Sequence, residues 1–325
     1  MDHAVRIHET GGPEVLRYET FDPGEPGPGE VLVRQEAMGC NFIDVYNRTG
    51  LYPLPALPAV LGKEGAGVVE AVGAGVSEVR VGDRVAYAAM LSGGYATRRV
   101  IAAHRLVVLP EGISFATAAG MMLRGMTARY LLHGCHPVGR GDTVLLHAAA
   151  GGVGSIVSQW AAYLGATVIG TVGSEAKEVL ARVGGCAHVI RYDKEDFVAR
   201  VRDITGGRGV DVVYDAVGKA VFLPSLDCLR PRGTMVTFGN ASGAVEPFAP
   251  SLLAQKGSLF LTRPILKDYT DSREDLLEHA RDLFDVVGCG AVAIAIGNSF
   301  PLAEAAQAHR ILEGRGTHGS TILTP

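Results

Sequence analysis

Three small residues after an apolar segment have the types and the spacing of a phosphate-binding turn. Ala149, Gly151 and Gly154 follow the apolar run 144–147. Small side chains permit a tight turn and bring the backbone close to a pyrophosphate, while a glycine at 154 lets a helix pack against its strand. The helix that begins here offers unpaired N–H groups and a positive dipole end to phosphate. The alternative is an ordinary tight turn of another α/β protein.

The residues after the next expected strand bear on the choice of dinucleotide. Gly173 stands where an NAD site usually carries Asp or Glu for the ribose hydroxyls. Ser174 can hydrogen-bond a phosphate, Lys177 adds positive charge one helical turn later, and Tyr192 can stack on or hydrogen-bond the same end of the cofactor. This combination predicts NADPH rather than NADH. The alternative for Lys177 is an exposed surface lysine.

The elements that must position these residues alternate in type. A helix is expected from the glycine turn to about residue 164, with a strand at 168–172, and strands and helices then alternate to about residue 262. This rhythm predicts an α/β fold with a doubly wound parallel sheet of about six strands. A second helix is expected at 127–133 and a strand at 292–296. Residues 1 to about 125 are β-rich, with proline and glycine turns between short strands.

Composition limits the function classes. At 325 residues the chain is long enough for two domains, and 47% hydrophobic against 20% charged residues is typical of a globular protein. We expect no membrane span and no signal peptide. The net charge of −4 argues against nucleic acid as a primary ligand. Five scattered cysteines without a CxxC pair predict reduced thiols in a cytoplasmic protein.

By these motifs the chain resembles the medium-chain dehydrogenases/reductases, in their zinc-free quinone oxidoreductase (zeta-crystallin-like) branch. The resemblance covers essentially the whole chain. The segments that carry it are 11–16 (GGPEVL), 41–46 (NFIDVY), 50–53 (GLYP), 82–85 (GDRV), 147–154 (HAAAGGVG), 238–240 (FGN) and 257–264 (GSLFLTRP).

The resemblance implies the domain organisation and the extent of the cofactor site. It implies a GroES-like catalytic domain at 1–125, an NADPH-binding Rossmann domain at 126–264, and a segment at 265–325 that returns to the catalytic domain. It further implies a cleft between the domains and a homodimer. With the residues discussed above, the cofactor-binding residues are then expected to be Asn41, Thr127, Ala149, Gly151, Gly152, Val153, Gly173, Ser174, Lys177, Tyr192, Phe238, Asn240 and Arg315.

Metal binding separates the branches of this superfamily. Asn41 stands where the zinc enzymes carry a cysteine ligand, and Lys63 replaces the histidine of their Gly-His-Glu motif. A protonated lysine cannot bind zinc, and a zinc site needs three or four converging ligands. We therefore predict no metal. Cys40, beside Asn41, is interpreted as a buried thiol.

Without a metal, quinones and conjugated enones are the suitable acceptors, because hydride addition to them gives a delocalised anion. Asn41 and Tyr46 can donate hydrogen bonds to the acceptor oxygen, and Tyr52 is a candidate for the wall of the site. These three are the predicted catalytic residues. The alternative is that Tyr46 is a core aromatic and Asn41 a turn residue.

Three functions follow from the sequence. The first is an NADPH-dependent quinone reductase, with hydride and one-electron transfer both left open. The second is an NADPH-dependent alkenal or enoyl double-bond reductase. The third is an RNA-binding, zeta-crystallin-like protein, against which the net charge and the lack of a basic aromatic stripe argue.

Overall fold

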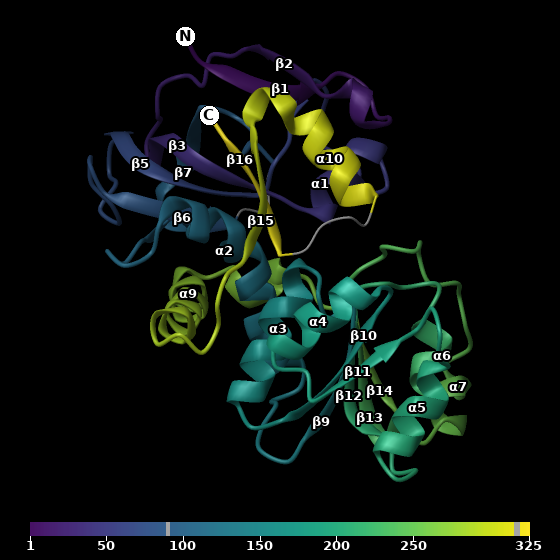
Figure 1. The fold of residues 1–325 in the computed structure, drawn as a ribbon. Coiled ribbons are helices and arrows are strands. Elements are labelled where there is room, and N and C mark those ends of the chain that lie inside the picture. The colour runs from purple at the N-terminus through teal and green to yellow at the C-terminus, as the bar shows by residue number, and fades with distance from the viewer. Residues whose placement is uncertain (89–91, 315–318) are drawn as a thin grey trace. The chain divides into compact units, whose positions relative to one another are not determined.

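A computed structural model describes residues 1–88, 92–314 and 319–325 of the chain. It contains two compact units (Figure 1). Unit 1 comprises Met1–Arg124, Ser272–Phe284 and Ile294–Pro325, and unit 2 comprises Gly125–Asp271 and Asp285–Ala293. No helix within these described ranges is long and apolar enough to cross a membrane.

Unit 1 is a β-rich domain. Its strands are β1 (His3–Ile7), β2 (Arg17–Thr20), β3 (Glu30–Cys40), β4 (Ala59–Val60), β5 (Glu64–Val72), β6 (Arg84–Ala88), β7 (Arg98–Ala102), β8 (Val107–Val108), β15 (Ile296–Pro301) and β16 (Ser320–Thr324). Its helical elements are η1 (Pro13–Val15), α1 (Phe42–Thr49), η2 (Ala103–Arg105), η4 (Leu302–Glu304) and α10 (Ala305–Glu313). The long strand β3 organises the larger sheet, because it pairs with β5, β7 and β16.

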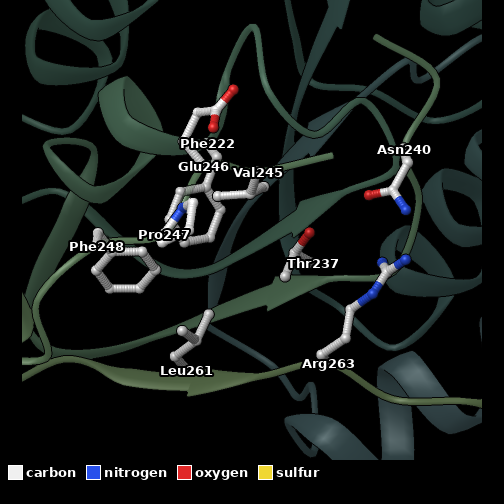
Figure 2. A pocket seen from close by; sticks show the side chains of 9 residues that line it. All are labelled: Phe222, Thr237, Asn240, Val245, Glu246, Pro247, Phe248, Leu261 and Arg263. Atoms are coloured by element: carbon white, nitrogen blue, oxygen red, sulfur yellow. The ribbon is translucent and has the colours of Figure 1, made fainter. Parts of the chain in front are cut away.

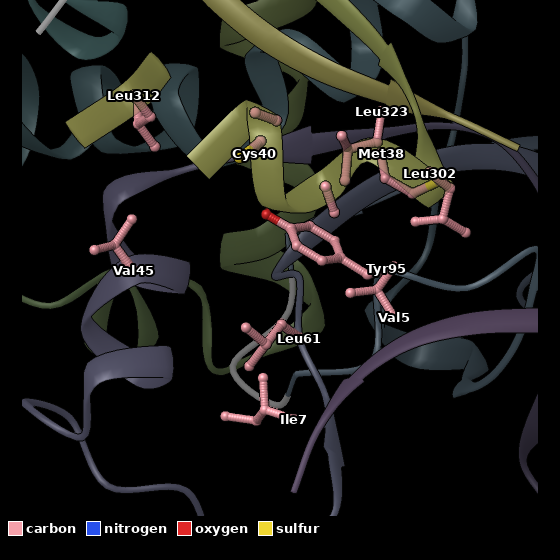
Figure 3. Packing of buried hydrophobic residues seen from close by; sticks show 12 residues of the cluster. Val5, Ile7, Met38, Cys40, Val45, Leu61, Tyr95, Leu302, Leu312 and Leu323 are labelled. Atoms are coloured by element: carbon pink, nitrogen blue, oxygen red, sulfur yellow. The ribbon is translucent and has the colours of Figure 1, made fainter. Parts of the chain in front are cut away.

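The core beside α1 and α10 joins distant parts of the sequence. Val5, Met38 and Leu61 are completely buried there with Leu323 from the last strand (Figure 3). Tyr95 lies in the same cluster, and its hydroxyl is within 3.1 Å of both Asp44 and His309. Burial of these apolar groups stabilises the domain, and the polar bonds fix α1 against α10.

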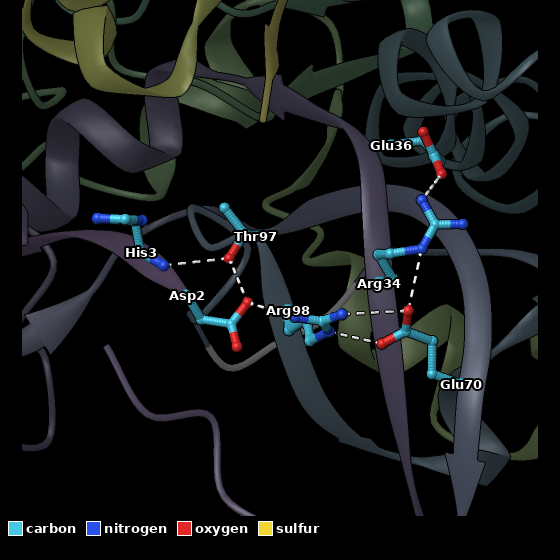
Figure 4. Close-up of polar contacts among 7 residues, drawn as sticks. All are labelled: Asp2, His3, Arg34, Glu36, Glu70, Thr97 and Arg98. Carbon is cyan, nitrogen blue, oxygen red and sulfur yellow. Dashed lines mark hydrogen bonds and ion pairs between the residues drawn. The ribbon is translucent and has the colours of Figure 1, made fainter. Parts of the chain in front are cut away.

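A surface network of charges connects neighbouring strands of unit 1. Arg98 on β7 contacts Asp2 at 2.9 Å and Glu70 of β5 at 2.6 Å (Figure 4). Glu70 also contacts Arg34 of β3 at 3.0 Å, and Arg34 in turn pairs with Glu36. Single exposed pairs contribute little stability, but a network with fixed geometry helps to hold register.

Unit 2 is a doubly wound parallel sheet. Its strands, in the spatial order β11-β10-β9-β12-β13-β14, are β9 (Thr143–His147), β10 (Thr167–Val172), β11 (His188–Arg191), β12 (Val210–Asp215), β13 (Leu229–Thr237) and β14 (Phe260–Thr262). The helices are α3 (Gly152–Tyr163), α4 (Glu175–Val183), α5 (Phe197–Ile204), α6 (Phe222–Leu226), α7 (Ser251–Gln255) and α8 (Leu266–Thr270). Right-handed crossovers place α3 and α4 on one face and α5 to α7 on the other (Figure 1). The predicted six-stranded parallel sheet is confirmed.

Two local expectations were wrong. The helix expected at 127–133 is not separate. Instead, α2 (Phe115–Arg129) continues through Gly125 into a π-helical turn at Tyr130–Cys135. The packing of its buried residues outweighs the low helix propensity of the glycine. The strand expected at 292–296 instead spans Ile296–Pro301, where parallel pairing with β16 is available. Val292 packs in the core. The charged helix α9 extends over Arg273–Gly288.

Candidate functional site

The glycine turn of unit 2 leaves space for a ligand beside the protein backbone at the start of α3. Gly151 is the residue before this helix, and its N–H bonds Ala148 O at 2.8 Å. A Cβ on Gly154 would lie 2.2 Å from Ala148 O, so only glycine allows the helix to start this close to β9. The N–H groups of Gly152 and Val153, in the first helical turn, have no partner within the helix. The geometry fits a phosphate.

The corner after β10 brings together four predicted cofactor residues. Ser174 begins α4, and its hydroxyl accepts a hydrogen bond from the backbone N–H of Lys177. The N–H of Tyr192 bonds Val172 O at 3.2 Å, and a Cβ on Gly173 would lie 2.3 Å from Tyr192 Oη. Tyr192 therefore lies directly over Gly173, in the place where an acidic side chain would otherwise stand.

A nearby cation was not singled out in the sequence. Arg191, in register with Val172 on the neighbouring strand, pairs with Asp193 at 2.6 Å, and this bond raises the pKa of the Arg191 guanidinium. Arg191 is thus a second cation at this corner, beside Lys177 at the start of α4.

A second part of unit 2 lies at the carboxyl ends of β12 and β13. A pocket of about 460 Å³ is lined there by Asn240 and Arg263 on one side and by apolar residues including Phe222 and Phe248 on the other (Figure 2). The guanidinium of Arg263 points toward Asn240. Phe238 is held by a bond from its N–H to Asp215 O at 2.8 Å.

Asp215 is the last residue of β12. Its Oδ1 accepts hydrogen bonds from the N–H groups of Val217 and Gly218 at 2.7 and 2.9 Å. Burial raises the pKa of Asp215 to about 6, against the effect of these two bonds. The carboxyl therefore shapes the loop that precedes α6. The side chain of Thr127, on α2, is buried and interacts with Tyr130.

In unit 1, Asn41 is the residue before α1 and is almost fully buried. Its amide Nδ2 donates to Glu64 Oε1 at 2.6 Å, and its backbone N–H donates to Asp44 Oδ2 at 2.8 Å. Glu64 Oε2 accepts from the N–H of Leu123 at 2.7 Å, and burial raises the Glu64 pKa although Arg124 opposes this. The side-chain amide of Asn41 has two N–H groups, and Glu64 accepts a hydrogen bond from one of them.

The rings of Tyr46 and Tyr52 lie against each other. Their ring centroids are 5.1 Å apart in an edge-to-face arrangement. The N–H of Tyr52 bonds Tyr46 O at 3.1 Å, and Asn47 Nδ2 bonds Tyr52 O at 2.9 Å. Helix α1 and the loop after it therefore fix both phenols.

The donors at the positions of the zinc ligands do not suit zinc. Asn41 is bound to Glu64, and burial raises the pKa of the Cys40 thiol to about 12, far from the thiolate that zinc requires. Lys63 stands at the position of the zinc enzymes' histidine and interacts electrostatically with Asp44. Among residues 1–88, 92–314 and 319–325, no three His, Cys, Asp or Glu side chains converge as metal ligands would.

The predicted site residues therefore form two groups, one in each unit. Unit 2 holds the glycine turn, the corner at Gly173, and Phe238 with Asn240; unit 1 holds Asn41, Tyr46 and Tyr52. Arg315 lies outside the described residues. The sequence analysis missed Asp44, which accepts from the backbone N–H of Asn41, since nothing in its spacing marks it.

Known proteins resemble this chain over its whole length. Residues 27–137 match the alcohol dehydrogenase GroES-like domain family, and residues 152–281 match the zinc-binding dehydrogenase family. A quinone oxidoreductase of Pseudomonas aeruginosa is 51% identical, with 100% of both chains covered. A 2-haloacrylate reductase of a Burkholderia species is 47% identical, covering 99% of this chain and 98% of its own. The solved structure of Escherichia coli quinone oxidoreductase complexed with NADPH superposes with a TM-score of 0.98 at 46% identity, covering 99% and 100% of the two chains.

Proposed function

The chain belongs to the medium-chain dehydrogenase/reductase superfamily, among its quinone oxidoreductases, and we propose that it reduces quinones with NADPH without a metal. The observation that carries the proposal is the corner after β10. Gly173 offers no carboxylate to a ribose, Tyr192 covers it, and Ser174 and Lys177 follow. The NADPH bound to the Escherichia coli relative supports the same cofactor here.

Each group of residues then has a defined task. The N–H groups at the start of α3 bind the pyrophosphate, and Lys177 with Tyr192 binds the 2′-phosphate end. Phe238 and Asn240 position the nicotinamide, which supplies a hydride when NADPH is bound. Tyr46 donates a hydrogen bond to the acceptor oxygen as negative charge develops there, with the second amide N–H of Asn41 as a further donor and Tyr52 supporting the Tyr46 ring.

A second candidate is the reduction of conjugated double bonds. The Burkholderia relative named 2-haloacrylate reductase supports it, since it is nearly as similar to this chain as the quinone oxidoreductases are. The experiment that tests both functions is steady-state kinetics with NADPH and NADH against one ortho-quinone, one para-quinone and one enal. We expect kcat/KM to be highest with NADPH and a quinone. Turnover of the enal alone would replace the first function by the second, and no turnover of any acceptor would contradict both.

Metal independence is tested separately. Because Lys63 and Asn41 replace two ligands, we expect the purified protein to contain no stoichiometric zinc and to keep its activity after chelation. Activity that disappears with a chelator and returns with zinc would contradict this.

We also propose a homodimer through the edge of the parallel sheet. Strand β14 is an edge strand of the sheet. Phe260 and Leu261 on this strand are exposed, and so is Ile265 shortly after it. Exposed apolar edge strands pair readily with a second chain. Sedimentation should give a dimer for the wild type and a monomer for Phe260→Asp; a monomeric wild type would contradict the proposal. The five free cysteines support a reducing, cytoplasmic location.

A further inference from the structure

Glu64, the first residue of β5, is a carboxylate completely enclosed by unit 1. In the pairing of β3 with β5 it stands opposite Gly39. A Cβ on Gly39 would lie 2.1 Å from Glu64 Oε1 and 2.4 Å from the carbonyl oxygen of Ala119 on α2. The carboxylate therefore fills the space that the glycine leaves between β3 and α2. A carboxylate is rarely buried in this way unless its neighbours compensate the charge.

Both carboxylate oxygens of Glu64 accept hydrogen bonds. Oε1 accepts from Nδ2 of Asn41 at 2.6 Å, and Oε2 accepts from the backbone N–H of Leu123 at 2.7 Å. Burial raises the pKa of Glu64, and the positive charge of Arg124 is the main influence in the opposite direction. An ionised carboxylate can accept hydrogen bonds but cannot donate them. The contact therefore requires the nitrogen of the Asn41 amide, rather than its oxygen, to face Glu64.

The oxygen of the Asn41 amide is held by the helix that follows. Asn41 and Asp44 form a capping box at the start of α1, which places the side-chain oxygen of Asn41 toward the N–H of Asp44. Asn41 is only 6% exposed, so its side chain has little room to move. With the oxygen toward Asp44 and one N–H bonded to Glu64, the direction of the second N–H is set by these two contacts.

We propose that Glu64 is a positioning residue of the reductase, which holds the amide of Asn41 in the orientation that presents its second N–H to the acceptor oxygen. Glu64 acts through Asn41 and does not itself contact the reacting groups. The inference rests on the proposed function, because it explains how one of the proposed hydrogen-bond donors is oriented. The negative charge of Glu64 is essential to it, since a neutral side chain of the same size would not require the nitrogen to face it.

Glu64→Gln changes the hydrogen bonding without changing the size of the side chain. The N–H of Leu123 belongs to the backbone of α2 and cannot turn, so the glutamine oxygen should face it and the glutamine NH2 group should face Asn41. Two NH2 groups cannot bond each other, so the Asn41 amide must flip and lose its donor position. On the folded variant, kcat/KM for a quinone should fall by about 10- to 100-fold while the Kd of NADPH stays the same. A residue that only supports the fold would leave both quantities unchanged.

A reversed pair tests the orientation of the amide without any turnover. Asn41→Asp keeps a good helix cap but places a second carboxylate against Glu64, so the urea midpoint of unfolding should fall. Adding Glu64→Gln to Asn41→Asp again gives one donor facing one acceptor, with the roles exchanged. The midpoint should therefore recover in the double variant. Its kcat/KM should remain low, because an aspartate at position 41 has no N–H to donate.

Glu70→Gln is the matched control, because it makes the same change on the same strand, where the carboxylate pairs with Arg34 and Arg98. It should leave kcat/KM unchanged. A folded Glu64→Gln with the kcat/KM of the wild type overturns the inference, and so does a double variant whose midpoint does not recover. The double variant decides the matter if Glu64→Gln alone does not fold. A wild type that reduces no quinone contradicts the proposed function, and the midpoints still report on the orientation of Asn41, so the two failures are distinguishable.

Discussion

At the scale of single residues, the phenol of Tyr46 is the group whose role is most open to test. Tyr46→Phe removes the hydroxyl and keeps the ring that packs against Tyr52. If the hydroxyl donates to the acceptor oxygen mainly in the transition state, kcat/KM should fall by about 10- to 100-fold while NADPH affinity stays the same. Tyr18→Phe, at a 44% exposed site of the same unit, should change neither quantity. An unchanged kcat/KM for several quinones would remove Tyr46 from the mechanism.

The sequence predicted roles for these residues but not all of the contacts that they make. Tyr46 was expected to donate to the acceptor and Tyr52 to lie in the wall of the site. The structure places their ring centroids 5.1 Å apart, and both roles stay predictions. Asn41 was expected to donate a hydrogen bond to the acceptor. In the structure, Glu64 accepts a hydrogen bond from one of the two amide N–H groups of Asn41. That contact joins Asn41, between β3 and α1, to Glu64, 23 positions later at the start of β5, and no local pattern reveals such a pair.

At the scale of elements, the strand–turn–helix unit from β9 to α3 depends on one close backbone approach. A Cβ on Gly154 would lie 2.2 Å from Ala148 O and 3.0 Å from two backbone carbons, so Gly154→Ala must displace the start of α3. We expect a loss of about 1–3 kcal/mol in the free energy of unfolding, with weaker binding of NADPH and NADH alike. Denaturant unfolding and a cofactor titration measure the two effects.

Gly139 provides the control for that experiment. A Cβ there meets nothing within 4 Å, so Gly139→Ala should be close to neutral. If both substitutions have equal effects, the approach of α3 to Ala148 is not what makes glycine necessary at 154. Periodicity predicted this unit correctly because every part of it is local in sequence. The strand at Ile296–Pro301 was misplaced because its position depends on pairing with β16.

At the scale of the whole molecule, buried histidines connect folding to pH. His147 is fully buried between Thr171 and Ser225, and burial lowers its pKa to about 3. In the unfolded chain this histidine takes up a proton as the pH falls below 6.5, whereas in the folded chain it stays neutral until the pH nears 3. Its contribution to the free energy of unfolding is therefore fully present above pH 6.5 and is lost as the pH falls toward 3. His309 behaves in the same way, whereas the raised pKa values of Asp44 and Asp215 act in the opposite direction.

The contribution of His147 is isolated by His147→Gln, which can hydrogen-bond but cannot titrate. Between pH 7 and pH 5 the wild type should lose on the order of 2 kcal/mol more unfolding free energy than the variant. Unfolding by urea at both pH values measures the difference. A variant whose stability falls as steeply as that of the wild type would show that His147 is not neutral in the folded protein.

Lys177→Ala tests most directly whether the corner after β10 selects NADPH. The substitution removes the ammonium group and leaves the backbone N–H that bonds Ser174. Gly173→Asp is less informative, because its Cβ would collide with Tyr192. The measurement is the pair of dissociation constants for NADPH and NADH, with Lys267→Ala, at an exposed lysine paired with Asp271, as the control. We predict that the wild type prefers NADPH and that Lys177→Ala weakens NADPH binding by about 10- to 100-fold with NADH hardly changed. Equal affinities in the wild type, or an equal loss for both cofactors in the variant, would contradict the account.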